Sequence, residues 1–160
     1  MRYVIDANVI FDFRDGGLLS ELGELPDHEF MIIDAVWHGE IDGDTRDACP
    51  NLNVLNSSPD ELAEASRIRA NNRGLSFNDC RSIVACKIHD AILTTGDGHM
   101  RTMAQDLKVR ITGSIGLLDD LLACQIIGHD QACRAIDKME ETDRRLPPKI
   151  ISQRREEWGC

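Results

Sequence analysis

The chain has 160 residues, of which 42 % are hydrophobic, 29 % charged and only 4 % aromatic. This composition is typical of one soluble globular domain, and the low aromatic content argues against binding single strands mainly by base stacking. No apolar run approaches the roughly 20 residues of a membrane span, and the N-terminus lacks a signal-peptide pattern. We therefore expect a cytoplasmic protein that does not contact a membrane.

The formal net charge is −10, which argues against nucleic-acid binding through overall positive charge. The charge is uneven, however: residues 1–65 carry −12 and residues 66–110 carry +4. A polyanion can approach the basic segment if a bound metal neutralises the acidic one. The alternative is an ordinary solvated charged surface.

Short apolar runs alternate with helical segments, which predicts an α/β fold with a mostly parallel, five-stranded sheet. In chain order, we predict strands at residues 2–6, 29–33, 52–55, 91–95 and 109–111. Helices are expected near residues 9–16, 18–22, 35–41, 58–73, 76–89, 99–107, 114–124, 130–142 and 149–157, with a loop around Gly43. Ser58 and Ser76 have the pattern of helix N-caps.

The segment from Arg144 to Pro148 is the one linker-like feature. It divides the chain into a main domain at residues 1–143 and a C-terminal helical extension at 144–160, which packs on the domain or beyond it. The six cysteines form no Cys-x-x-Cys pair and no zinc-finger spacing. We expect all six to be free and reduced.

Four acidic residues fall where a parallel sheet forms its sites, at the carboxyl ends of strands or on the helices beside them. Asp6 ends the first strand and Asp97 follows the fourth. Glu40 lies on the helix after the second strand, and Asp79 lies in the first turn of the helix before the fourth. Clustered carboxylates repel one another unless a hard cation such as Mg²⁺ or Mn²⁺ compensates them. Such ions activate water for attack on a phosphodiester.

Each acid also has a plain structural explanation. Asp6 could cap the following helix, and Asp79 could be the acid of a capping box with Ser76. Glu40 could be a solvated helix residue, and Asp97 could be a turn residue. No Ser or Cys has a His at a recognisable catalytic spacing, and no phosphate-binding Gly-rich loop is present.

Several stretches together resemble the PIN-domain family of ribonucleases, including a poorly characterised PIN subgroup. The matching segments are residues 3–8 (YVIDAN), 36–41 (VWHGEI), 75–80 (LSFNDC), 91–97 (AILTTGD) and 109–118 (VRITGSIGLL). The resemblance covers roughly residues 1–125, and its specificity comes from the set and order of the motifs.

The resemblance implies a three-layer sandwich with a twisted parallel sheet and an endoribonuclease that binds Mg²⁺ or Mn²⁺. Many relatives are VapC-like toxins paired with an antitoxin, and many are homodimers. The residues that match the family's acids, polar site positions and candidate RNA contact are, in that order, Asp6, Glu40, Asp79 and Asp97; Asn8 and Thr95; and Arg101. Asp34, which follows the second strand directly, is a rival for Glu40.

Two other functions remain open. A haloacid-dehalogenase-type phosphatase also begins with a strand that ends in Asp, but it needs a second Asp two residues later, where this chain has Asn8. A non-catalytic PIN-fold regulatory module is the second alternative, and the complete set of acids argues against it.

Overall fold

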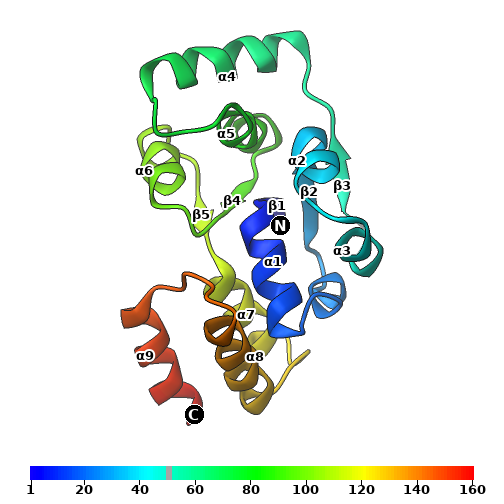
Figure 1. Cartoon of the computed structure of the whole chain (residues 1–160), viewed down its shortest axis with the longest axis vertical. Coiled ribbons are helices and arrows are strands. Elements are labelled where there is room, and N and C mark those ends of the chain that lie inside the picture. The colour runs from blue at the N-terminus through cyan, green and yellow to red at the C-terminus, as the bar shows by residue number, and fades with distance from the viewer. Residues whose placement is uncertain (50–51) are drawn as a thin grey trace.

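The computed structural model describes residues 1–49 and 52–160. Its centre is a fully parallel five-stranded sheet with the strand order β3-β2-β1-β4-β5 (Figure 1). The strands are β1 (Arg2–Ile5), β2 (Glu29–Ile33), β3 (Asn53–Leu55), β4 (Ile92–Thr94) and β5 (Ile111–Thr112). The predicted α/β three-layer architecture is confirmed.

The helices in the described ranges flank this sheet. They are α1 (Ala7–Gly16), the short 3-10 helix η1 (Glu21–Glu24), α2 (Asp34–Gly39), α3 (Gly43–Ala48), α4 (Pro59–Asn71), α5 (Phe77–His89), α6 (Gly98–Asp106), α7 (Ser114–Ala123), α8 (His129–Glu141) and α9 (Pro148–Trp158). In Figure 1, α4 and α5 lie above the strands, and α7, α8 and α9 lie below them. None of these helices is long and apolar enough to cross a membrane.

The central strand β1 is covered on both faces. Tyr3, Val4 and Ile5 are all nearly inaccessible to solvent. A strand buried on both faces reads as a continuous apolar run rather than as an alternating one, which is why this strand was readable in the sequence. Its parallel register places Val4 beside Met31 of β2 and Leu93 of β4. The carboxyl ends of β1 and β4 therefore meet at one edge of the sheet.

Reciprocal capping boxes start α4 and α5, as the sequence predicted, with Ser58 and Ser76 as the N-cap residues. The loop predicted around Gly43 is wrong, because α3 occupies it. The Asp42 carboxylate accepts hydrogen bonds from the Thr45 backbone N–H at 2.9 Å and from the Thr45 hydroxyl at 2.7 Å. These bonds stabilise a helix too short and polar to show a hydrophobic period. The helix predicted at residues 18–22 is also displaced, to η1.

The C-terminal helices pack back onto the domain. Helix α8 packs on α1, and α9 packs on α8. Contact between α1 and α8 is close at Gly16, where an added Cβ would lie 2.6 Å from the Met139 side chain. A side chain at this crossing would require the end of the flexible Met139 side chain to shift.

The prediction that all six cysteines are free is wrong. Cys133 on α8 and Cys160 after α9 form a disulfide, with their Cα atoms 5.8 Å apart. They are 27 residues apart in the chain, so only the packing of α9 on α8 makes them neighbours. The remaining cysteines, namely Cys49, Cys80, Cys86 and Cys124, are free.

Reducing this disulfide should destabilise the docked C-terminal helix. In the chain-entropy model a loop of this length contributes up to about 3.5 kcal/mol. We expect dithiothreitol to lower Tm of the wild-type protein, and Cys160→Ser to lower it equally without reductant. Thermal denaturation followed by circular dichroism measures both effects. Cys124→Ser, at an exposed free cysteine, is the control. A wild-type Tm that does not respond to reductant would contradict the pairing.

Candidate functional site

Asp6 lies where β1 ends, directly beside the end of β4. Its backbone N–H donates to the Thr94 carbonyl at 3.0 Å, and its carboxylate accepts a hydrogen bond from the Thr95 hydroxyl at 2.9 Å. Although Asp6 occupies the N-cap position of α1, its side chain makes no capping hydrogen bond. The alternative that Asp6 serves only as a helix cap is therefore wrong.

The surroundings of Asp6 disfavour its charged form. The pKa of this carboxyl is raised from an ordinary 3.8 to about 6, mainly by burial, and the negative charges of Asp79 and Glu40 contribute to the rise. Hydrogen bonds from Thr95 and Asn8 act in the opposite direction. Three of the four predicted acids thus interact electrostatically at this edge of the sheet, with an excess of negative charge that a cation would relieve.

Asp79 begins α5 and has the structural role that the sequence allowed. One of its carboxylate oxygens accepts from the Ser76 backbone N–H at 2.7 Å, and its own N–H donates to the Ser76 hydroxyl at 3.1 Å. A carboxylate has two oxygens and about four acceptor positions. Capping therefore leaves Asp79 able to bind a second group.

Asp97 is the N-cap residue of α6. Its side chain accepts from the Met100 backbone N–H at 2.8 Å, and its backbone N–H donates to the Thr95 hydroxyl at 3.1 Å. The Thr95 hydroxyl consequently contacts both Asp6 and Asp97, the first and last of the predicted acids. Thr95 is fully buried, so this connection is rigid.

The two rivals for the remaining acid differ sharply. Glu40 lies just past α2, as its C-cap residue, rather than on the helix as predicted. Its carboxylate is exposed and accepts from the Asn78 side-chain amide at 3.3 Å, next to Asp79. It therefore stays largely available to a ligand.

Asp34 is instead partly exposed and already paired with other groups of the protein. Its carboxylate accepts from the Arg81 guanidinium at 2.5 Å and from the Ala35 N–H at 2.7 Å. Burial alone would raise the pKa of Asp34, but these hydrogen bonds hold it below its ordinary value. The buried Arg81 is further held by the Ser57 hydroxyl at 2.9 Å. This geometry favours Glu40 over Asp34 as a free acidic ligand.

Within residues 1–49 and 52–160, no three His, Cys, Asp or Glu side chains lie together in a group that could hold a metal ion. The donor set nevertheless fits a hard divalent cation, because every candidate ligand is a carboxylate oxygen. Asp79 and Asp97 each bind a backbone N–H group through one carboxylate oxygen. A carboxylate has further acceptor positions, which remain for a cation.

Arg101 and Asn8, which the sequence analysis predicted as substrate-binding residues, already form hydrogen bonds within the protein. One guanidinium nitrogen of Arg101 donates to the backbone carbonyls of Thr95 and Thr112 at 2.9 and 3.1 Å, joining the ends of β4 and β5. Its contact with RNA stays a prediction. Asn8 lies in the first turn of α1, where its carbonyl accepts from Arg144 at 2.9 Å.

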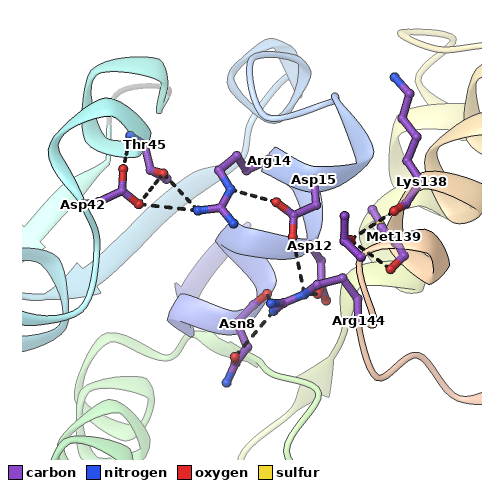
Figure 2. Close-up of polar contacts among 10 residues, drawn as sticks. Asn8, Asp12, Arg14, Asp15, Asp42, Thr45, Lys138, Met139 and Arg144 are labelled. Carbon is purple, nitrogen blue, oxygen red and sulfur yellow. Dashed lines mark hydrogen bonds and ion pairs between the residues drawn. The ribbon is translucent and has the colours of Figure 1, made fainter.

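The sequence analysis missed a polar cluster behind Asn8 (Figure 2). Asp12, one turn further along α1, is buried, with 7 % of its surface exposed, and it accepts from Arg144 at 2.6 Å and from the Ser114 hydroxyl. Figure 2 shows the Arg144 guanidinium reaching α1 between Asp12 and Asn8. An acid on the buried face of an amphipathic helix was the available signal, because such a charge requires a partner.

The pKa of Asp6 gives a prediction for the protein in EDTA. A carboxyl whose pKa is raised on folding, from 3.8 to about 6, lowers stability as pH rises through that interval. Asp6→Asn should therefore stabilise the metal-free protein at pH 7.5 by at most about 3 kcal/mol and have little effect near pH 4. Urea denaturation at the two pH values measures this. Equal effects at both pH values would show that Asp6 is not destabilised by its surroundings.

The chain belongs to the PIN-domain family: the model of the family described as "DUF3368: PIN domain" matches residues 2–159. Among solved structures, the chain is similar to PAE2754 from Pyrobaculum aerophilum, with 19 % identity, a TM-score of 0.54, and coverage of 77 % of this chain and 99 % of the other. It is also similar to a chain of VapBC-1 from nontypeable Haemophilus influenzae, with 13 % identity, a TM-score of 0.51, and coverage of 72 % and 99 %. No curated protein matches the sequence.

Proposed function

We propose that this protein is a divalent-metal-dependent endoribonuclease with its active site around Asp6. The observation that carries the proposal is the set of acids at the junction of β1 and β4, where the pKa of the half-buried Asp6 carboxylate is raised in part by the charges of two other acids. Buried titratable groups with strongly perturbed pKa values cluster at functional sites. Membership of the PIN family supports a nuclease in particular.

Asp6, Glu40, Asp79 and Asp97 would hold Mg²⁺ or Mn²⁺. When bound, such an ion supplies an activated water and neutralises negative charge developing on the phosphodiester oxygens. The chain's own residues fix the geometry: the Thr95 hydroxyl orients Asp6 at 2.9 Å and the Asp97 backbone at 3.1 Å. Rigid positioning of this kind accounts for much of the rate in phosphoryl-transfer enzymes.

The phosphatase alternative is not favoured. It requires a general acid at the position of Asn8, whose side-chain oxygen faces Arg144 at 3.5 Å and has no ionisable proton to give. The regulatory-module alternative lacks an observation of its own. A toxin role, with an antitoxin protein as partner and a homodimer as the working form, is a finer proposal that rests on the likeness to VapBC-1.

The proposal is tested with a 5′-labelled single-stranded RNA and the purified protein. We expect cleavage in Mn²⁺ or Mg²⁺, none in EDTA, and recovery when excess metal is restored. Para-nitrophenyl phosphate should not be hydrolysed under the same conditions. Full RNA cleavage in EDTA would rule out the mechanism, and phosphatase turnover would favour the alternative.

Substitutions of Glu40 and of Asp34 should show which of the two is the metal ligand. We expect Glu40→Gln to raise the Kd for Mn²⁺ about tenfold with little loss of stability. Asp34→Asn should leave the Kd almost unchanged but destabilise the fold by about 2–3 kcal/mol, because the buried Arg81 loses its charge partner. Isothermal titration with Mn²⁺ and urea denaturation measure the two effects. The reverse pattern would make Asp34 the ligand.

A further inference from the structure

A cavity of about 460 Å³ adjoins the candidate site on the side of β5. It shares Thr95 with that site, and its walls include Arg101 and the first turn of α7. The opposite wall comes from the C-terminal segment through Arg145, Leu146 and Pro147. Thr95 connects this cavity to Asp6, because its hydroxyl donates to the Asp6 carboxylate at 2.9 Å.

The acidic residues of the cavity are already compensated. Asp12 is paired with Arg144 at 2.6 Å, and Asp119 accepts from the Arg154 guanidinium at 2.9 Å. Arg145, in contrast, is exposed and makes no hydrogen bond or ion pair with any residue in the described ranges. The cavity therefore presents a free cation, with its negative charges neutralised.

The backbone just before Arg145 is held by the contacts of Arg144. Arg144 donates to the Asp12 carboxylate at 2.6 Å and to the Asn8 carbonyl at 2.9 Å, so the chain enters this segment in a defined place (Figure 2). The remaining wall is apolar: Leu146 and Pro147 line it together with Ile150, which is 42 % exposed. A charged group and an apolar surface thus face the same space.

We propose that this cavity is a subsite for one nucleotide of the RNA strand, with Arg145 binding its phosphate and Leu146 and Ile150 covering its ribose or base. Its volume is in the range of sites for ligands of nucleotide size and is too small for a folded partner. A cation beside an apolar surface complements a nucleotide, which carries a phosphate and a flat base that can stack through its face. This inference rests on the proposed ribonuclease function and assigns part of the substrate site to the C-terminal segment.

The test measures binding separately from cleavage. The Kd of a 5′-fluorescein single-stranded RNA is measured by anisotropy in EDTA, where cleavage is not expected, for the full-length wild type, Arg145→Ala and Lys149→Ala. Lys149→Ala is the matched control, since this exposed cation lies four residues away and outside the cavity. We expect Arg145→Ala to raise Kd about five- to tenfold and to reduce the salt slope by about 0.7, with less than a twofold change for Lys149→Ala.

Equal effects of the two variants, or none, would overturn the subsite, and the cavity would then be open to a segment of a protein partner. RNA binding that depends on Arg145 but is followed by no cleavage in Mn²⁺ would support the subsite and refute the ribonuclease. If both hold, Arg145→Ala should raise KM for RNA and leave kcat within about twofold, as expected of a residue that binds substrate equally in the ground and transition states.

Discussion

Asp6→Asn should lower the kcat of metal-dependent RNA cleavage by about two to three orders of magnitude. Asn keeps the shape of the side chain and can still accept a hydrogen bond from the Thr95 hydroxyl, which now lies 2.9 Å from the carboxylate. It lacks the negative charge that would hold a divalent cation. Single-turnover cleavage at saturating Mn²⁺ measures the loss.

Asp44→Asn is the matched control, because this exposed acid on α3 loses the same charge away from the site. Its cleavage rate should stay close to that of the wild type. The Asp6 variant should also be at least as stable as the wild type at pH 7.5, so that a loss of rate cannot come from unfolding. An active Asp6→Asn enzyme would move the catalytic site elsewhere.

Arg144→Ala should produce the largest loss of stability from a single polar residue of the C-terminal segment, about 3 kcal/mol. It leaves Asp12 buried, with 7 % of its surface exposed and the Ser114 hydroxyl as its remaining partner. It also removes the hydrogen bond that holds the Asn8 carbonyl at 2.9 Å, next to the site. Urea denaturation at pH 7 measures the free energy of unfolding.

The neighbouring substitution Arg145→Ala is the control and should change stability by less than about 0.5 kcal/mol, because this side chain is exposed. Arg144→Lys should recover part of the loss, since an ammonium group can pair with Asp12 but lacks the planar fork that reaches Asn8 as well. Equal stabilities for the alanine variants at 144 and 145 would contradict a structural role for this ion pair.

The sequence predicted the sheet well because its signals are local. The central strand β1 contains an unbroken apolar run. Ser58 and Ser76 mark the starts of α4 and α5, because a capping box needs only four consecutive residues. Helix α3 was missed because it is short and polar and shows no hydrophobic period. It is stabilised instead by the hydrogen bond that the Thr45 N–H donates to the Asp42 carboxylate. The fifth strand was displaced because two residues carry too little pattern to fix their bounds.

The part of the candidate site that lies at the ends of strands could be predicted from the sequence. Asp6 and Asp97 follow strands that pair in parallel, which places them at one edge of the sheet. What one sequence could not show are contacts between distant segments: Arg144 with Asp12, and Cys133 with Cys160. The choice between Glu40 and Asp34 also depended on such a contact, because Arg81 binds Asp34 from 47 residues away.

The most direct test of the central claim is a crystal structure of the protein soaked in Mn²⁺, with the ion located by its anomalous signal. The account predicts a peak bound by the Asp6 carboxylate, with Asp79, Asp97 and Glu40 turned toward it and Asp34 still paired with Arg81. It is contradicted if saturating Mn²⁺ leaves Asp6 without an ion, or if the only ordered ion lies away from the junction of β1 and β4.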